Sequence, residues 1–116
     1  AGLDRFEASG VEFAISTEDG SLGHRGRVTE VLEGLIAARS GTQRIACCGP
    51  EPMMRAVSAL AECYNVACEV SLETPMACGI GICFTCVAKV QQSDGTWDYR
   101  RTCMEGPIFP APSIVW

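Results

Sequence analysis

The chain has 116 residues, of which 47% are hydrophobic and 20% are charged, so it fits one folded domain or two small ones. Its formal net charge of −5 argues against partners that attract basic surfaces, namely nucleic acids and anionic membranes. No apolar run approaches the roughly 20 residues that cross a bilayer, and no N-terminal signal pattern is found, so we expect a cytoplasmic protein.

The number of cysteines is unusual for such a protein. Eight cysteines would suggest disulfides in a secreted chain, but nothing in this sequence indicates secretion. In a reducing compartment, clustered thiols more often bind metal or carry out redox chemistry. The chain also begins at Ala1 without an initiator methionine, so we expect it to be a fragment.

The first elements follow from hydrophobic periodicity. Residues 11–17, VEFAIST, form a short apolar run typical of a buried strand, and a turn-rich loop follows. From residue 28, apolar side chains recur at helical spacing and predict a helix to about residue 39. Ser40-Gly41 is expected to end that helix.

The next three elements repeat this alternation. Residues 44–48, RIACC, predict a second strand, and a helix is expected to begin at Glu51 or Pro52. Residues 66–72 alternate apolar and polar, which predicts a third strand. The predicted buried stripe of the helix consists of Met53, Val57, Leu60 and Tyr64. Strands alternating with helices indicate an α/β fold with a parallel sheet covered by helices.

The character of the chain changes after residue 72. Residues 86–90 and 96–103 predict a β-hairpin closed by a turn at residues 93–95, SDG. The proline-rich tail that follows is expected to lie extended over the surface. We therefore predict a domain boundary between residues 72 and 73, with an α/β portion over 1–72 and a small cysteine-bearing module over 73–116.

Four cysteines form a candidate metal site. Cys78, Cys83 and Cys86 have the spacing C-x4-C-x2-C, and sixteen residues separate Cys86 from Cys103. This order matches the plant-type pattern for a [2Fe–2S] cluster, in which four thiolates bind two irons. The loop contains two glycines, which allow unusual backbone angles and a close approach of amide N–H groups to the sulfurs. The spacing therefore predicts a [2Fe–2S] module.

Other interpretations of the cysteines remain open. A structural zinc ion also takes four thiolates, although zinc ribbons usually pair two C-x2-C units and this chain has one. A disulfide from this loop is a further alternative. Outside the cluster, we interpret Cys47, Cys63 and Cys68 as packing residues.

A second candidate site joins the second strand to the second helix. Cys48, Gly49 and Pro50 lie at the carboxyl end of a predicted parallel strand, where open α/β sheets bind nucleotides. The alternative is a tight strand-to-helix turn with Met53 and Met54 filling the core. By itself this motif is modest evidence for a cofactor-binding site.

Several stretches resemble a known family. CGPEPMM resembles the nicotinamide-side motif of the ferredoxin-NADP reductase family, and the cysteines downstream resemble its iron–sulfur branch, the electron-transfer subunits of NAD-dependent dihydroorotate dehydrogenases. TEDGSLGHRGRVTEVL, VSLETPMACGIGICFTCVAKV and RTCMEGPIFPA are similar to the same subunits. The resemblance covers essentially the whole chain, and its cysteine segment is the most specific part.

The resemblance implies an electron relay in pyrimidine biosynthesis. A partner catalytic subunit would oxidise dihydroorotate at its FMN, and electrons would pass through the [2Fe–2S] cluster to FAD and then NAD⁺, within a heterotetramer. By motif match, the iron ligands are Cys78, Cys83, Cys86 and Cys103, while Cys48 and Gly49 lie beside the nicotinamide. No residue of this chain is then required as a catalytic acid, base or nucleophile.

The resemblance also implies what this chain lacks. The flavin-binding barrel of such subunits and the glycine-rich first turn of their nucleotide domain are not found in the sequence. We therefore expect no FAD site here and no NADH turnover by this chain alone. The cluster module and the tail are expected to contact the partner subunit, because a relay between subunits must lie near a subunit surface.

The cofactor preference follows from three residues after the first predicted strand. Where NADP-using relatives typically carry a serine and an arginine, this chain has Thr17, Glu18 and Asp19. The two acids would repel a 2′-phosphate and can accept a hydrogen bond from a ribose hydroxyl, which favours NAD(H). The alternative is that these are acids in a solvated turn.

Two rival functions remain. One is an electron-transfer subunit of another iron–sulfur flavoprotein oxidoreductase, such as a sulfide dehydrogenase-like or transhydrogenase-like enzyme. The other is a non-enzymatic zinc-binding interaction module, which would be colourless and would show no redox response.

Overall fold

The computed structural model describes residues 2–39, 41 and 43–116, and it separates into two compact units. The units divide between residues 40 and 41, so the second unit holds both the strands around residues 44–71 and the cysteine-bearing segment. The boundary expected between residues 72 and 73 stays a prediction. Within the described residues, no helix has the length and apolar character needed to cross a membrane.

The first unit contains two helices and one short strand pair. Its elements are α1 (Leu3–Ser9), β1 (Ser16–Thr17), β2 (His24–Arg25) and α2 (Val28–Ala38), with β1 parallel to β2. The helix predicted from residue 28 is confirmed, and Ile36 is its buried residue. Helix α1 had not been predicted.

The long strand predicted over residues 11–17 is wrong for most of its length. Regular strand structure is limited to Ser16 and Thr17, and the Val11 and Phe13 residues are 59% and 40% exposed. Only these two residues pair with β2, and an extended segment without a hydrogen-bonding partner is not stable as a strand. The hydrophobicity of residues 11–17 therefore predicted a longer strand than the one that forms.

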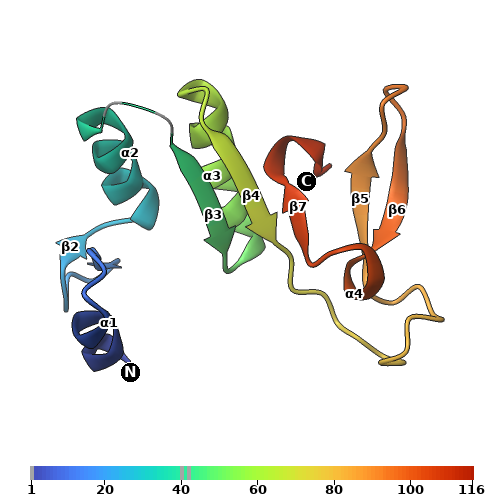
Figure 1. The fold of residues 1–116 in the computed structure, drawn as a ribbon, viewed down its shortest axis with the longest axis horizontal. Helices are drawn as coiled ribbons and strands as arrows, with labels where there is room; N and C mark the ends of the chain where they lie inside the picture. Colours follow the sequence, from blue (N-terminus) through green and yellow to red (C-terminus); the bar gives the residue numbers. More distant parts are fainter. Residues whose placement is uncertain (1, 40, 42) are drawn as a thin grey trace. The chain divides into compact units, whose positions relative to one another are not determined.

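A three-stranded sheet forms the frame of the second unit. Strands β3 (Arg44–Cys48) and β4 (Ala67–Ser71) are parallel and are joined by helix α3 (Glu51–Cys63), which packs on both of them (Figure 1). Strand β7 (Ile108–Pro110) pairs antiparallel with β4, giving the order β3-β4-β7. The predicted α/β class with parallel strands is confirmed, and the carboxyl ends of β3 and β4 lie side by side.

In helix α3 the predicted burial of Val57 is confirmed, but the other members of the predicted stripe are not its buried residues. Met54, Val57 and Ala61 are its buried residues, with 3%, 3% and 2% exposure. Of the predicted stripe, Met53 and Leu60 are only half-buried and Tyr64 is 42% exposed. The helix carries two pairs of neighbouring apolar residues, Met53-Met54 and Leu60-Ala61. Periodicity therefore predicts the helix but does not decide which member of each pair faces the core.

The predicted hairpin is confirmed. Strands β5 (Val87–Gln91) and β6 (Trp97–Arg101) pair antiparallel. In the turn, the Gln92 amide donates to the Thr96 carbonyl, and Asp94 Oδ1 accepts the Thr96 amide at 2.9 Å. The return strand ends earlier than expected, because residues after Arg101 form a short helix, α4 (Thr102–Glu105). Cys103 therefore lies on a helical turn and not on the strand.

The tail does more than extend over the surface, which corrects the sequence prediction. Phe109 on β7 and Ala111 at the start of the 3₁₀ helix η1 (Ala111–Ser113) are buried, with 6% and 2% exposure. Beyond η1, Ile114 bridges Val90 and the Val115 amide donates to the Lys89 carbonyl at 3.0 Å. The tail thus joins the sheet at β7 and the hairpin at β5.

Val70 tests the packing of this sheet. It lies on the central strand, fully buried, opposite Phe109 of β7. We expect Val70→Ala to lower the free energy of unfolding by about 2 kcal/mol, because it removes buried methyl groups and leaves a cavity. Urea denaturation measures this change. Val115→Ala, at a residue that is 38% exposed, is the matched control and should cost under about 0.5 kcal/mol. Equal losses for the two variants would contradict this account of the core.

Candidate metal centre

The loop between β4 and β5 carries three of the four candidate thiols. Its residues 72–86 form no helix or strand, and Gly79 and Gly81 adopt φ of 67° and 77°. These left-handed angles suit glycine, and Gly81 is itself buried with the Met104 thioether packed where a β-carbon would lie. The glycines therefore allow the loop to turn tightly and allow Met104 to pack directly against its backbone.

The Cys78 thiol accepts hydrogen bonds from backbone N–H groups of its own loop. Hydrogen bonds from the backbone N–H of Cys83, and then from that of Ile80, stabilise the thiolate and lower the pKa of Cys78 to about 6. The Cys83 thiol adds a further hydrogen bond to Cys78. Cys78 and Cys83 thus form one thiol pair, and backbone donors hold negative charge on it.

Cys86 and Cys103 form a second pair. Their sulfurs are 3.0 Å apart, although the residues come from the end of the loop and from α4. The hydrogen bond between the two sulfurs lowers the pKa of Cys86 and raises that of Cys103. The negative charge of Cys78 also raises the Cys103 pKa, so the two pairs are electrostatic neighbours.

Buried Thr102 fixes the second pair. Its amide donates to the Cys86 carbonyl at 2.8 Å and its hydroxyl donates to the same oxygen at 3.2 Å. The Thr102 hydroxyl also contacts that of Thr74, before the first cysteine. Because Thr102 is 4% exposed, these polar atoms have no access to water and need these partners. The sequence did not reveal this role, although the position of Thr102 next to Cys103 could have suggested it.

The donor set fits an iron–sulfur cluster in chemistry. The four thiols form two pairs, which are linked by the electrostatic effect of Cys78 on Cys103, and two pairs of thiolates are what two irons require. Among residues 2–39, 41 and 43–116, no group of three or more His, Cys, Asp or Glu side chains is arranged around a single metal point. The assignment of all four cysteines as ligands stays a prediction at this stage.

The cysteines outside this site divide into two kinds. Burial raises the pKa of Cys47 and of Cys68, which agrees with their interpretation as packing residues. Cys63 is exposed on α3, so the packing interpretation is wrong for this residue.

Cys48, Gly49 and Pro50 connect β3 to α3 at the carboxyl edge of the sheet. Gly49 has φ of 152°, with Met53 packed where a β-carbon would lie, and Pro50 precedes the first turn of α3. The Cys48 sulfur is 4.0 Å from Glu73 Oε1. Gly49 and Pro50 line an open groove of about 460 Å³, whose other walls are residues 72–74, 87–89 and 114–116 with Glu51 and Met54. The groove could hold a planar ring, but nucleotide binding there stays a prediction.

The other nucleotide candidates lie in the first unit. The Thr17 hydroxyl donates to the Leu22 carbonyl and accepts the Leu22 amide, so the turn itself uses it. Asp19 accepts the Ser21 amide at 2.9 Å, and this hydrogen bond lowers the pKa of Asp19. These contacts describe a self-contained turn in which the acids face solvent. They agree with the alternative interpretation of Glu18 and Asp19 and leave the cofactor preference untested.

Comparisons with known proteins place this site in a family. Residues 73–115 match the family described as the iron–sulfur cluster binding domain of dihydroorotate dehydrogenase B. The chain is 40% identical over 114 residues to the electron transfer subunit of dihydroorotate dehydrogenase B (NAD(+)) from Caldanaerobacter subterraneus subsp. tengcongensis, covering 98% of this chain and 44% of the relative. It is 43% identical to the subunit of that name from Bacillus caldolyticus, covering 97% and 40%.

A solved structure shows the same fold. The structure described as an NADH-dependent reduced ferredoxin-NADP oxidoreductase, studied for flavin-based electron bifurcation, superposes with a TM-score of 0.76 at 28% identity, covering 97% of this chain and 38% of that one. The chain thus spans less than half the length of the relatives it matches. Residues 73–115 therefore match the iron–sulfur cluster binding domain of dihydroorotate dehydrogenase B, and nearly the whole chain is similar to part of the electron transfer subunits of that name.

Proposed function

We propose that this chain passes electrons through a [2Fe–2S] cluster held by Cys78, Cys83, Cys86 and Cys103. The observation that carries the proposal is the convergence of these thiols as two pairs inside a matched iron–sulfur domain. When bound, such a cluster supplies one-electron transfer. The chain's own contribution is to orient the thiolates, to direct backbone N–H groups at Cys78 and to connect Cys103 to the loop through Thr102.

For the whole protein, we propose the relay of its family. The partner would be an FMN-containing dihydroorotate dehydrogenase subunit in a heterotetramer, and electrons would continue from the cluster to FAD and NAD⁺ in a cytoplasmic enzyme of pyrimidine biosynthesis. The names of the relatives support an electron transfer role. The groove lined by Gly49 and Pro50 is the proposed place of the nicotinamide, and Cys48 directly precedes Gly49 in the chain. The two proposed modules cover residues 1–72 and 73–116, and the second coincides with the matched family domain.

A second candidate differs only in the partner. The superposition on an NADH-dependent reduced ferredoxin-NADP oxidoreductase favours another flavin-linked electron transfer enzyme as the alternative. The discriminating experiment reduces the assembled complex with dihydroorotate. Cluster reduction by dihydroorotate would support the first assignment, and reduction only by NADPH or ferredoxin would support the second.

The proposal predicts a red-brown protein with two irons and two sulfides per chain after anaerobic reconstitution. Single Cys→Ser changes at Cys78, Cys83, Cys86 or Cys103 should each lower the bound iron at least about tenfold, since a lost thiolate opens the cluster to solvent. Iron analysis and the visible spectrum before and after dithionite measure this. Cys63→Ser removes an exposed thiol outside the site and should leave iron unchanged. A colourless wild-type chain that binds one zinc instead would contradict the proposal.

The metal-free chain should show a pH-dependent thiol at Cys78. Because the pKa is lowered to about 6, the thiolate predominates at pH 7 and is lost as the pH falls below 6. Iodoacetamide should therefore alkylate Cys78 faster than Cys47 and Cys68 at pH 7, and about tenfold more slowly at pH 5 than at pH 7. Peptide mass spectrometry measures the rates, and loading with iron and sulfide should protect Cys78. Alkylation of Cys78 that is slow at pH 7 and rises only near pH 9 would contradict this assignment.

The proposed preference for NAD⁺ can be tested in the complete subunit. Glu18→Ser combined with Asp19→Arg removes two negative charges and adds one positive charge where a 2′-phosphate would lie. The ratio of kcat/KM for NAD⁺ over NADP⁺ should fall about fivefold or more, since an exposed charge contact is worth roughly 1 kcal/mol. Arg39→Gln, within the same compact unit, is the charge control. An unchanged ratio would assign the two acids to a solvated turn only.

A further inference from the structure

Arg101 connects the two segments that carry the thiols. It is the last residue of β6 and lies two positions before Cys103. Its Nη1 donates a hydrogen bond to the Gly81 carbonyl at 2.7 Å, and Gly81 lies between Cys78 and Cys83 in the loop. One side chain thus holds the loop against the strand that leads to the fourth thiol.

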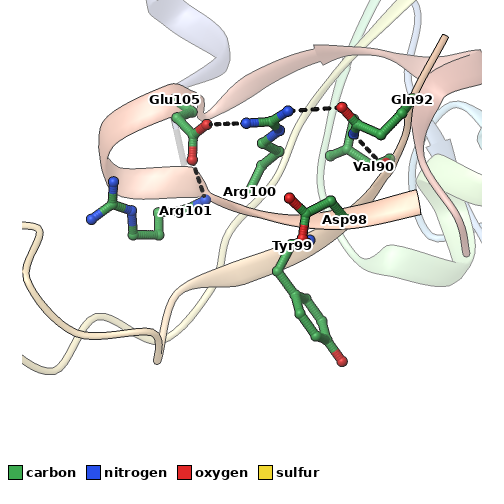
Figure 2. A network of polar contacts seen from close by, with 7 residues as sticks. All are labelled: Val90, Gln92, Asp98, Tyr99, Arg100, Arg101 and Glu105. Atoms are coloured by element: carbon green, nitrogen blue, oxygen red, sulfur yellow. Dashed lines mark hydrogen bonds and ion pairs between the residues drawn. The ribbon is translucent and has the colours of Figure 1, made fainter. Parts of the chain in front are cut away.

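The guanidinium of Arg101 lies against the loop, and it interacts with Glu105 only at longer range, where its charge helps to lower the pKa of Glu105. Its guanidinium carbon lies 5.6 Å from the centre of the Phe84 ring, in the same loop. Glu105 accepts the backbone amide of Arg101 at 2.9 Å, not its guanidinium (Figure 2). Of the ion pairs found in the described part of the chain, none includes Arg101.

The neighbouring Arg100 is a natural comparison. Successive residues of a strand point to opposite faces, and Arg100 points away from the loop. Its guanidinium pairs with Glu105 Oε1 at 3.0 Å and donates to Gln92 Oε1 at 2.8 Å, as Figure 2 shows. Arg100 therefore braces the hairpin through an ion pair, whereas the Arg101 guanidinium binds the loop and forms none of the salt bridges found among the described residues.

We infer that Arg101 is a positioning residue that sets the reduction potential of the proposed cluster. By binding the Gly81 carbonyl it holds the cysteine-bearing loop against the strand that leads to Cys103, and its guanidinium places a positive charge at this loop. Reduction adds one negative charge to the cluster, so a fixed positive charge nearby favours the reduced state. This inference rests on the proposed function.

The test compares three variants of this chain after anaerobic reconstitution. Arg101→Gln removes the charge and keeps an amide donor, Arg101→Lys keeps the charge, and Arg100→Gln removes a charge one residue away. Iron content, far-UV circular dichroism and an EPR-monitored redox titration are measured for each. At the wild-type midpoint potential, Arg101→Gln should lower the ratio of reduced to oxidised cluster threefold to tenfold, where tenfold corresponds to about 59 mV for one electron. Arg101→Lys and Arg100→Gln should stay within about twofold of wild type.

The outcomes separate the two proposals. If Arg101→Gln folds but loses iron, with iron regained in Arg101→Lys and retained in Arg100→Gln, the positioning role is supported. Arg101→Gln with wild-type iron and a wild-type ratio overturns the inference. Equal effects of Arg101→Gln and Arg100→Gln also overturn it, since they would reflect net charge or hairpin stability. A wild-type chain that takes up no iron overturns the proposed function and this inference together.

Discussion

The cluster module depends on one buried polar contact, that of Thr102 with the Cys86 carbonyl. The loop over residues 72–86 has no helix or strand of its own, so its conformation is fixed by what it touches. Thr102 bonds that carbonyl through both its amide and its hydroxyl, and it also contacts Thr74 at the start of the loop. Leaving such buried groups unpaired costs roughly 1–3 kcal/mol each, so opening the loop is unfavourable even without metal. The contact brings Cys103 to Cys86 as a consequence of folding.

The module is also held at both of its ends by the same pair of strands. It leaves the sheet after β4 and returns to it as β7, which pairs antiparallel with β4, and the Leu72 amide donates to the Pro107 carbonyl at 2.9 Å. The two ends of the segment between β4 and β7 therefore lie side by side. The entropy lost in closing this long segment is offset by the hydrogen bonds between β4 and β7 and by the burial of Phe109. Motion of the hairpin is restrained at a third place, where Val115 bonds Lys89.

Local signals in the sequence predicted the elements that complete themselves locally. Strand β3, helix α3 and the hairpin have strong periodicity, turn residues and a proline at the helix start, and the structure confirms them. Elements that need distant partners were missed or misplaced: within residues 11–17 only Ser16 and Thr17 pair with another strand, β7 requires β4, and the buried face of α3 depends on the sheet beneath it. The same division holds for the site. The spacing of the four cysteines was enough to predict them as ligands. Arg101 and Thr102 donate hydrogen bonds to backbone carbonyls of the loop, and such contacts cannot be predicted from residue types because every residue has a carbonyl.

Charge balance connects these features to electron transfer. The chain is acidic overall, and the proposed cluster with its four thiolates would add further negative charge, so positive groups near the site would stabilise it. Backbone N–H groups supply part of it at Cys78, and Arg101 supplies a full charge at Gly81. The nearby acid, Glu105, is directed elsewhere: the Arg101 amide and then the Arg100 guanidinium lower its pKa, so its carboxylate is held by the hairpin and kept from the thiols. Two adjacent arginines thus have different direct partners: Arg100 forms the ion pair with Glu105, the only acid of α4, and Arg101 binds the Gly81 carbonyl of the loop.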